Sequence, residues 1–597
     1  MRMRIVFSAI ILVWIILLVR IYYISIKSNT YYEEIANQNA IKVERLAPLR
    51  GSIIDVQGRP MAVNRLGFSI GITPHLSARA KQAVLDEEIT FLSTLLKQDP
   101  DELKKRYLRK DSPYFQGFVT VVDFISHDAL IEHFSRISLR DNLQIVPSSK
   151  RHYPYGKLAS HVIGYVGRAN LDDYNEDPIS RLTNHVGRTG IENYYNAVLQ
   201  GKEGERRTKV TAFNQEIEEI SKNLPSSTDL ELTIDLELQQ YISEIFGEDA
   251  GAVVVMDTRD GKLLAAGSYP EYDLNQFVTG ISHEAWEELM GNLDNPFTNK
   301  LVNGLYPPGS VVKMGVGLAL LGTQKITRQT SYYCTGSFEL GGRNFRCWKQ
   351  QGHGQTELNK AIRESCDDYF YKASLKVGID ALTPVLERLG FGDRTGVDLP
   401  NEFIGTVPGR HWKMQRYQKP WYQGETLISS IGQGYFLSTP LQVALHTGIL
   451  ATGKKVTPHF VKRINGEDVE YPVDESVLTE IEKAELPHIQ RAMYEVANHP
   501  NGTAYYRLLN SKVKVAAKTG TAQVVGIGQD VKKRIKEEEM EYFHRSHAWL
   551  TSYGPYKDPR YVVTVLMEHG GHGGQAAGPI VTKIYNKLHE LGYIKDE

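Results

Sequence analysis

The segment YPPGSVVKMG, residues 306–315, places a serine three positions before a lysine, directly after a Pro-Pro-Gly turn. If that turn leads into a helix, Ser310 and Lys313 lie on the same helical face, and the lysine side chain can reach the hydroxyl. A serine hydroxyl is a weak nucleophile until a neighbouring group accepts its proton, and a lysine can do so once burial has lowered its pKa. The pattern S-x-x-K is common by chance, so this prediction needs support from other motifs.

Two later segments supply that support. ESCDDYF, residues 364–370, contains Ser365 and Asp367, a hydroxyl and a carboxylate two positions apart. KVAAKTGTAQ, residues 514–523, ends a strand-like run. Its candidate site residues are Lys518, Thr519, Gly520 and Thr521. An S-x-x-K motif, then an S-x-N-like motif, then K-T-G is the active-site order of serine penicillin-recognising enzymes, and the three together are a specific signal.

Each residue of the third motif has a physical task. A glycine at position 520 removes a side chain, so that a substrate backbone can lie against the strand edge. Lys518 and Thr519 offer a positive charge and a hydrogen-bond donor to a substrate carboxylate. The oxyanion of an acyl-transfer intermediate needs two backbone N–H donors, which Ser310 and Thr521 would supply.

The amino-terminal residues predict a membrane anchor. Residues 5–26 are almost entirely apolar, and as a helix they would span roughly 33 Å, enough for a bilayer core. A cleavable signal peptide is the alternative, but the apolar stretch is long for one and no small-x-small cleavage site follows. Arg2 and Arg4 should hold the amino end in the cytoplasm, so the chain after Lys27 should lie outside.

The length and charge of the chain limit its class. At 597 residues it should contain two or more domains and needs no disulfides to build a core. Its 69 lysines and arginines balance 70 acidic residues, so no excess of positive charge indicates nucleic-acid binding. The turn-rich segment NLPSSTD, residues 223–229, indicates a domain boundary. Beyond it, strand-like runs at both ends enclose a helical section, which predicts one α/β or α+β domain closed by distant segments.

All three cysteines lie close together in the sequence. Cys334, Cys347, His353 and Cys366 give the pattern C-x12-C-x5-H-x12-C, with the ligand count of a closed tetrahedral zinc site but wider spacing than a zinc finger. One disulfide with a leftover thiol is an alternative in an oxidising compartment, and unrelated buried thiols are another. Zinc would protect the thiolates from pairing and give the histidine a role, so we favour a structural Zn²⁺ site. Four protein ligands leave no open position for water, which argues against a hydrolytic role.

The combined pattern resembles the class B penicillin-binding proteins, specifically the elongation-type penicillin-binding protein 2 of rod-shaped and helical Gram-negative cells. The resemblance covers nearly the whole chain. RGSIIDVQGRPMAVN (residues 50–64), RHYPYGKLASHVIGYVG (151–167) and GRTGIENYYNAVLQGKEG (187–204) look like the family's non-catalytic pedestal. PWYQGETLISSIGQGYFLSTPLQ (420–442) and HAWLTSYGP (547–555) look like elements that flank the transpeptidase site.

This resemblance implies a multidomain α+β fold. It consists of an N-terminal transmembrane helix, an elongated pedestal, and a C-terminal penicillin-binding transpeptidase domain with a central antiparallel sheet and flanking helices. We expect the cytoplasmic stub and anchor at residues 1–27, the dimerisation-type pedestal at 28–225 and the transpeptidase domain at 226–597. The implied location is the inner membrane, crossed once, with the catalytic domain in the periplasm.

The implied activity is peptidoglycan D,D-transpeptidation during lateral wall elongation. Ser310 would attack the penultimate D-alanine carbonyl of a stem peptide, release the terminal D-alanine, and pass the acyl group to an amine on a neighbouring strand, and β-lactams would acylate the same serine. The resemblance adds two partners, a polytopic glycan polymerase and a periplasmic scaffold protein, and no organic cofactor. A D,D-carboxypeptidase and a non-catalytic β-lactam-sensing or scaffold module stay open as alternatives.

The chain departs from the family pattern in two places. Asp367 stands where asparagine is usual, and an ionised carboxylate can accept a hydrogen bond from Lys313 but cannot donate one. Its charge also favours a protonated lysine, which leaves open whether Lys313 is the base, while Ser365 would relay a proton toward the leaving amine. Some relatives resemble this chain in carrying a zinc site of Asp, Asp, His and Cys, and the first two cysteines stand here in place of the aspartates.

Overall fold

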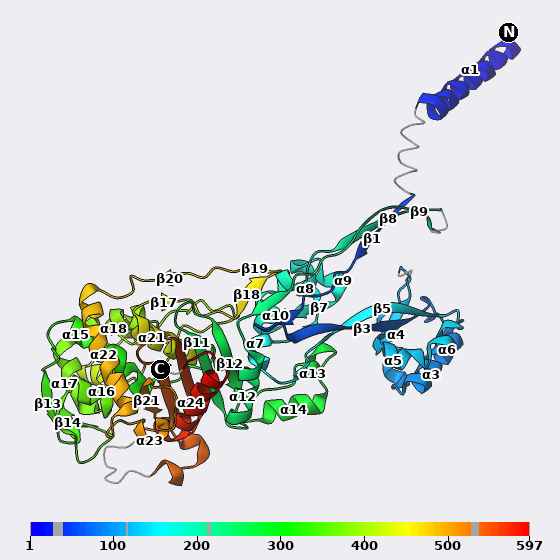
Figure 1. Ribbon diagram of the computed structural model, residues 1–597. Helices are drawn as coiled ribbons and strands as arrows, with labels where there is room; N and C mark the ends of the chain where they lie inside the picture. Colours follow the sequence, from blue (N-terminus) through cyan, green and yellow to red (C-terminus); the bar gives the residue numbers. More distant parts are fainter. Residues whose placement is uncertain (1, 28–39, 115–116, 212–215, 527–535, 596–597) are drawn as a thin grey trace. The chain divides into compact units, whose positions relative to one another are not determined.

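The computed structural model describes residues 2–27, 40–114, 117–211, 216–526 and 536–595 (Figure 1). The chain divides into two compact units. The first comprises Met1–Arg50, Ala169–Asn184 and Gln200–Ser227. The second comprises Gly51–Arg168, His185–Leu199 and Thr228–Glu597.

The first unit contains the apolar amino-terminal helix. It consists of α1 (Arg2–Tyr22) and a π-helical turn, η1 (Tyr23–Lys27). Over Met3–Lys27 it is long and apolar enough to cross a membrane, and it is the one such helix within the described ranges. Residue 28, where we expect the pedestal to begin, lies outside the described residues.

A small antiparallel sheet forms the rest of the first unit, with two short helices. Its strand order is β1–β8–β9. The bounds are β1 (Ile41–Leu46), β8 (Gly204–Val210), β9 (Glu216–Asn223), α8 (Leu171–Glu176) and α9 (Ser180–Thr183). Arg206 on β8 forms ion pairs with Glu216 and Glu219 on β9. These pairs are solvent-exposed and screened by water, so they favour the strand pairing only slightly.

In the second unit, a mixed sheet joins its amino-terminal part to strands much later in the chain. The order is β19–β18–β10–β2–β3–β4, and β5 also pairs with β3. The bounds are β2 (Ile53–Ile54), β3 (Pro60–Ile72), β4 (Val119–Ser126), β5 (Leu143–His152), β10 (Leu230–Leu232), β18 (Val461–Ile464) and β19 (Glu467–Asp468). Because β10 pairs with both β2 and β18, backbone hydrogen bonds hold part of the predicted pedestal and the predicted transpeptidase region in one unit.

Short helices complete the pedestal part of this unit. On α3, Leu85, Ile89 and Leu92 recur at helical spacing and are buried in a core with Val119 and Val121 of β4. The bounds of these elements are α3 (Gln82–Leu96), α4 (Pro100–Lys110), α5 (His127–Ile131), α6 (Phe134–Ser138), α7 (Ser160–Ile163), β6 (Val166–Arg168), β7 (His185–Gly187), α10 (Gly190–Tyr194) and α11 (Asn196–Leu199).

A five-stranded antiparallel sheet is the centre of the catalytic region. Its order is β12–β11–β23–β22–β21, so β21 lies at an edge. The bounds are β11 (Gly251–Asp257), β12 (Leu263–Tyr269), β21 (Ala516–Ala522), β22 (His547–Gly554) and β23 (Tyr561–Met567). Strands from both ends of this region therefore meet in one sheet, as the sequence predicts, and the α+β class is confirmed.

Helices cover both faces of this sheet. Thr447 on α21 (Pro440–Thr452) bonds to Thr551 of β22, and Tyr585 on α24 (Gly573–Glu590) bonds to the next residue, Ser552. Consecutive strand residues point to opposite faces, so α21 and α24 lie on opposite sides.

The remaining described elements lie between these strands or beside them. They are α12 (Leu236–Phe246), α13 (Asn275–Val278), α14 (His283–Gly291), η2 (Gly309–Val312), α15 (Lys313–Gly322), β13 (Ser331–Cys334), β14 (Ser337–Leu340), β15 (Arg343–Arg346), β16 (Gly354–Glu357), α16 (Leu358–Arg363), α17 (Asp367–Val377), α18 (Ile379–Arg388), α19 (Arg410–Tyr417), α20 (Gln423–Ser430), β17 (Lys455–Val456), β20 (Val473–Asp474), α22 (Glu480–Asn498), α23 (Tyr505–Leu508), η3 (Glu537–Glu539) and η4 (Tyr542–His544).

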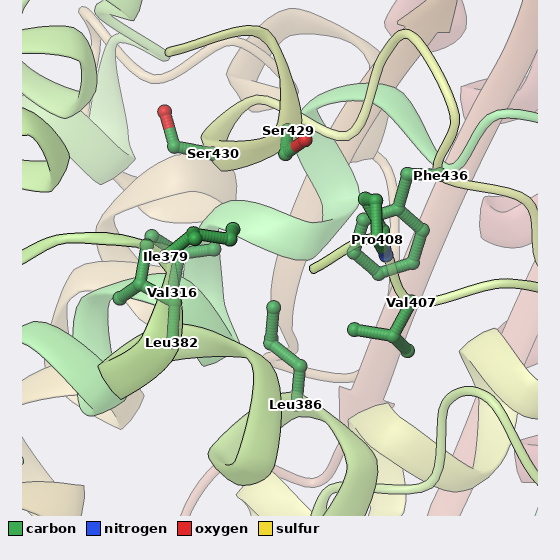
Figure 2. A pocket seen from close by; sticks show the side chains of 9 residues that line it. All are labelled: Val316, Ile379, Leu382, Leu386, Val407, Pro408, Ser429, Ser430 and Phe436. Atoms are coloured by element: carbon green, nitrogen blue, oxygen red, sulfur yellow. The ribbon is translucent and has the colours of Figure 1, made fainter. Parts of the chain in front are cut away.

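Helix α15 is buried on almost every side. Its residues are nearly all apolar or glycine, as expected for a core helix. Behind it, Val316 faces Leu382 and Leu386 of α18 and Phe436 around a narrow pocket (Figure 2). The pocket lining is mostly aliphatic, so it belongs to the packing that supports α15.

Candidate active site

The serine and lysine of the S-x-x-K motif lie in one continuous helical segment. The 3-10 turn η2 runs directly into α15, and the backbone N–H of Lys313 donates to Ser310 O. Lys313 is fully buried, whereas Ser310 is partly exposed. Gly309 has a φ of +56°, and a Cβ there would lie 2.8 Å from Thr521 O. Glycine at this position therefore lets the serine-bearing turn approach β21 closely.

The second motif holds Lys313. Its Nζ donates to Asp367 Oδ1 at 2.7 Å, to Ser365 O at 3.0 Å and to Ser365 Oγ at 3.3 Å. An ammonium group has three N–H donors, so these three acceptors saturate it. Within the described residues, no hydrogen bond joins Lys313 Nζ to the Ser310 hydroxyl. The contact expected from the spacing is not made in this structure, because Asp367 and Ser365 bind the lysine instead.

Ser365 has an unusual backbone conformation. Its φ is +56°, in the left-handed region that residues other than glycine rarely adopt. Its N–H donates to Ile362 O, and the N–H of Cys366 donates to Ala361 O, which closes the turn before α17. This conformation costs free energy and persists only where the surrounding structure enforces it, and such residues cluster at functional sites.

Two buried lysines and one buried carboxylate meet around the Ser365 hydroxyl. Lys518 Nζ donates to Ser365 Oγ at 3.0 Å and to Thr519 O at 2.9 Å. Burial, and then the positive charge of Lys313, hold the pKa of Lys518 well below its ordinary value. Burial raises the pKa of Asp367, and the charge of Lys313 opposes that shift. The site thus has one more basic group than acidic groups, and one of its lysines releases a proton readily.

The K-T-G motif lies on the edge strand β21. Thr519 Oγ1 is 2.7 Å from Thr503 Oγ1, within hydrogen-bond distance. A Cβ on Gly520 would lie 3.0 Å from Val311 Cγ1 and 3.1 Å from Pro308 O. A side chain at position 520 would crowd these atoms, so glycine also eases the packing of the serine-bearing turn on the strand. The role of leaving room for substrate stays a prediction. Among the described residues, no strand pairs with the outer edge of β21, so that edge can pair with an extended peptide.

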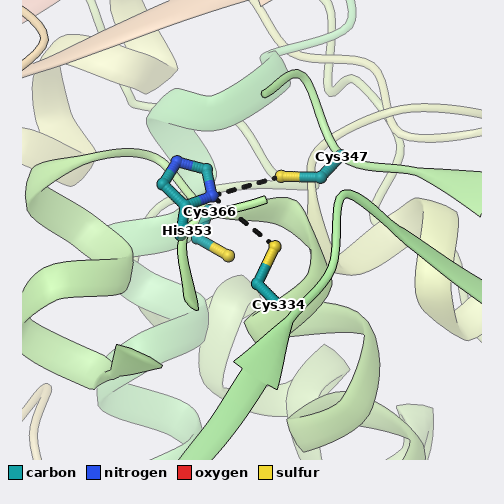
Figure 3. A group of neighbouring side chains, drawn as sticks. All are labelled: Cys334, Cys347, His353 and Cys366. Carbon is teal, nitrogen blue, oxygen red and sulfur yellow. Dashed lines mark hydrogen bonds between the residues drawn. The ribbon is translucent and has the colours of Figure 1, made fainter. Parts of the chain in front are cut away.

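The three cysteines and His353 converge on one point (Figure 3). Cys334 ends β13, Cys347 follows β15, His353 precedes β16, and Cys366 is the N-cap residue of α17. All four residues are buried, and their ligand atoms lie within 4.8 Å of one another. The cysteines are free thiols, so the alternative of a disulfide is not formed.

The spacing of these ligand atoms suits a tetrahedral zinc ion. With Zn–S of about 2.3 Å and Zn–N of about 2.0 Å, tetrahedral geometry separates a sulfur and a nitrogen ligand by about 3.5 Å. His353 Nδ1 lies 3.6 Å from Cys334 Sγ and 3.5 Å from Cys347 Sγ. A hydrogen bond from Cys366, followed by one from His353, lowers the pKa of Cys347, and the same hydrogen bond raises the pKa of Cys366. Cys347 is therefore the thiol that most readily becomes the thiolate that metals bind. The residues present therefore fit a closed structural site.

The cysteine cluster is connected to Lys313 through Trp348 and Asp367. Trp348 follows Cys347, and its backbone N–H donates to Asp367 Oδ2 at 2.8 Å. Its indole N–H donates to Glu364 O at 3.0 Å, which fixes the side chain as well. Asp367 binds Lys313 through its other oxygen. Any group that immobilises Cys347 therefore also helps to orient the carboxylate that holds the lysine.

Comparisons with known proteins agree with this geometry. Residues 251–586 match the family described as "Penicillin binding protein transpeptidase domain", and residues 45–230 match "Penicillin-binding Protein dimerisation domain". The chain is 36% identical to the peptidoglycan D,D-transpeptidase MrdA of Haemophilus influenzae, over 98% of this chain and 90% of that protein. It is 43% identical to the PBP2 chain in a PBP2–MreC complex from Helicobacter pylori, with a TM-score of 0.85, over 93% of this chain and 99% of that chain. The chain belongs to the penicillin-binding protein 2 family.

Sequence reasoning missed two residues that shape the site of this penicillin-binding protein. Gln433 Nε2 donates to Thr521 O at 3.2 Å. Gly432 O accepts from Gly309 N at 2.9 Å. Both contacts tie the loop after α20 to the serine-bearing turn and to the K-T-G strand. The G-Q-G run was the available signal, since glycines in an otherwise apolar segment mark close approach of backbones.

Proposed function

We propose that the chain is a peptidoglycan D,D-transpeptidase that cross-links stem peptides through a serine acyl-enzyme. The main support is the convergence of Lys313 and Lys518 on the Ser365 hydroxyl, beside a partly exposed Ser310 and an open strand edge. The Haemophilus influenzae relative is itself named a peptidoglycan D,D-transpeptidase, and this chain covers nearly all of it.

In the acylation step, Ser310 Oγ attacks the carbonyl carbon of the penultimate D-alanine. The C–N bond to the terminal D-alanine breaks, and an ester to the serine forms. The backbone N–H groups of Ser310 and Thr521 stabilise the oxyanion. Lys518 and Thr519 bind the terminal carboxylate, whose charge the extra basic group of the site complements.

Proton transfer in this step runs through the lysines and Ser365. The Ser310 proton passes to an uncharged amine, on Lys313 or on Lys518. Ser365 then carries a proton toward the leaving amine. Asp367 positions Lys313 through the 2.7 Å ion pair. An amine of a second stem peptide then attacks the ester, which restores Ser310 and completes the cross-link. β-Lactams acylate Ser310 in the same way.

The domain boundaries and the membrane location of the enzyme are also part of the proposal. We propose an anchor at residues 1–27, a pedestal at 28–225 and a transpeptidase domain at 226–597, with a single pass through the inner membrane and the catalytic domain in the periplasm. The apolar helix supports the anchor.

Two solved relatives support the partners, a periplasmic scaffold and a glycan polymerase. One is the Helicobacter pylori PBP2 in complex with MreC. The other, 26% identical with a TM-score of 0.71, covers all of this chain and 99% of its own and comes from "a peptidoglycan synthase complex" that coordinates polymerization and crosslinking.

We also propose that Cys334, Cys347, His353 and Cys366 hold one structural Zn²⁺. The ion would bind the thiolates and prevent their oxidation, with no open position for a substrate. On the protein side, the four residues clamp the loop that carries Ser365 to the segment before it. No organic cofactor is expected.

Product analysis tests the transpeptidase assignment directly. The purified chain is incubated with a pentapeptide stem donor and a D-amino-acid acceptor, and the products are separated by mass. We expect a product in which the acceptor replaces the terminal D-alanine. Release of D-alanine without transfer would make the protein a D,D-carboxypeptidase, and no product together with no penicillin adduct would make it a scaffold.

A further inference from the structure

Three aromatic side chains that the proposed mechanism does not use form a cluster on the surface of the catalytic region. The ring centroids of Trp412 and Tyr435 lie 5.3 Å apart, those of Tyr417 and Tyr435 5.4 Å, and those of Trp412 and Tyr417 5.7 Å. Tyr417 is 46% exposed, and the other two are partly exposed. We call these three residues the aromatic triangle.

The aromatic triangle lies close to the catalytic strand. Gln433 binds Thr521 O, the last residue of the K-T-G-T run. Tyr435 is two residues further along the same loop, so its Cα lies at most about 7 Å from that of Gln433. A substrate strand that extends past the Thr521 end of β21 can therefore reach the triangle.

The polar groups of the triangle have no hydrogen-bond partners in the part of the chain that the structure describes. Among the described residues, the indole N–H of Trp412 and the hydroxyls of Tyr417 and Tyr435 form no hydrogen bond. Trp421, nearby in the sequence, differs: it is buried, and its indole N–H donates to Thr426 Oγ1 at 2.8 Å. Tyrosine and tryptophan with open polar groups at a surface are typical of binding sites, whereas those in cores find partners.

Helix α19, which carries Trp412 and Tyr417, is anchored by a buried lysine and has exposed basic residues at and just beyond its carboxyl-terminal end. Lys413 of α19 is buried, forms an ion pair with Glu425 and lies over the ring of Tyr422. Arg416 and Lys419 are exposed, and neither forms an ion pair within the described part of the chain. The surface around the triangle thus offers positive charge to a ligand.

We propose that the aromatic triangle binds a sugar ring of the glycan strand that carries the stem peptide, an inference that rests on the proposed transpeptidase function. A pyranose ring has a flat C–H face that can stack on an aromatic ring, and its hydroxyl and acetamido groups can bond to the phenol and indole groups that have no partner. Stem peptides also carry carboxylates, which complement Arg416 and Lys419. The subsite would let the enzyme favour polymeric substrate over free peptide.

The test compares Trp412→Ala and Tyr417→Ala with wild type and with Tyr114→Ala, which removes a tyrosine that is 92% exposed on the pedestal. Each full-length protein is assayed in detergent with uncross-linked glycan strands that bear pentapeptides, and with free pentapeptide plus a D-amino acid. Loss of one stacking contact should raise KM for the polymer about tenfold with kcat little changed. Turnover of free pentapeptide and penicillin acylation should stay within about twofold of wild type, as they should for Tyr114→Ala on both substrates.

Three results would overturn the subsite. They are an unchanged KM for the polymer, an equal loss on free pentapeptide, and a loss that occurs only when a polymerase partner is added. If Trp412→Ala unfolds, the result with Tyr417→Ala decides whether the subsite exists. The Tyr417 side chain is half exposed, so its removal should leave the protein folded. Binding of the strands is also measured directly by calorimetry, with an expected tenfold weaker affinity, about 1.4 kcal/mol, in the variants. That binding result stands even if wild type forms no cross-links, so failure of the subsite and failure of the transpeptidase assignment are distinguishable.

Discussion

The pedestal and the catalytic region each bury charged side chains, but they pair the buried cations differently. In the pedestal, Arg151 donates to Glu192 at 2.7 Å and to Gly51 O at 2.7 Å, and the two side chains are 2% and 0% exposed. In the catalytic region, Lys313 pairs with Asp367, whereas the equally buried Lys518 forms no ion pair among the described residues. Arg151 therefore has a buried anion beside it, whereas Lys518 has none among the described residues.

This difference separates a structural ion pair from a reactive one. A buried charge with a matched partner is offset locally, so its removal costs stability. A second buried cation without its own partner has a lowered pKa and can be neutralised either by losing its proton or by binding an external carboxylate. Both outcomes suit an enzyme that must move a proton and bind the carboxylate end of a peptide.

The largest expected effect is the loss of acylation rate when Lys313 is replaced. Lys313→Ala should lower the rate of penicillin acylation by about 10³-fold, because positioned proton transfer typically contributes about 10²- to 10⁴-fold. Stopped-flow measurement with a fluorescent penicillin gives the rate. Circular dichroism serves as the folding control, and a folded variant that acylates at the wild-type rate would show that Lys313 takes no part in the chemistry.

The pedestal ion pair should affect stability alone. Glu192→Gln leaves Arg151 buried beside a neutral amide and should destabilise the protein by about 3–5 kcal/mol. Urea unfolding measures this change. The fraction that stays folded should acylate at the wild-type rate, and a slower rate per folded molecule would break the distinction between the two clusters.

Loss of the cysteine cluster should lower both the stability of the protein and its rate of acylation. Wild type should contain about one zinc per chain, and Cys347→Ser should contain close to none and lose about 3 kcal/mol or more of stability, as expected when a structural metal is removed. Acylation should also slow, since Trp348, next to Cys347, holds Asp367. Metal content is measured by mass spectrometry, and wild type free of zinc would refute the metal site.

The smallest expected effect concerns Glu271, which lies outside both clusters. It accepts hydrogen bonds from Ala159 N and Ser243 Oγ, both at 2.6 Å, and forms no ion pair among the described residues. Burial raises the pKa of Glu271 to about 7. Because the folded state then binds the proton more tightly than the unfolded state, stability should rise as the pH falls from about 7 to about 4.5.

Glu271→Gln should remove this part of the pH dependence. Unfolding in urea at about pH 5 and about pH 8 measures the slope for both proteins. An identical slope in wild type and variant would mean that Glu271 titrates at its ordinary pKa.

The sequence was sufficient to predict locally patterned strands and the cysteine cluster, but not the tertiary contacts of the site. The K-T-G strand and the strand-like runs at both ends of the catalytic region could be predicted, because local patterning decides them. The ligand set of Cys334, Cys347, His353 and Cys366 could also be proposed, since so few cysteines cluster so tightly.

Asp367 was anticipated as an acceptor for Lys313, and the structure has that contact. The two Ser365 acceptors could not be predicted, because they come from a loop more than fifty residues later. The close packing of Gly520 against Val311 and Pro308 was equally hidden, because it joins segments far apart in the sequence. The contact of Gln433 with Thr521 is likewise tertiary, and no local periodicity encodes it.

The central claim is that the hydroxyl at position 310 is the nucleophile that the two lysines serve. The most direct test is to treat the full-length protein with penicillin, digest it, and map the adduct by mass spectrometry. We expect one penicilloyl group on the peptide that contains Ser310, and none in Ser310→Ala. An adduct on another residue, or an adduct that persists in Ser310→Ala, would contradict the account.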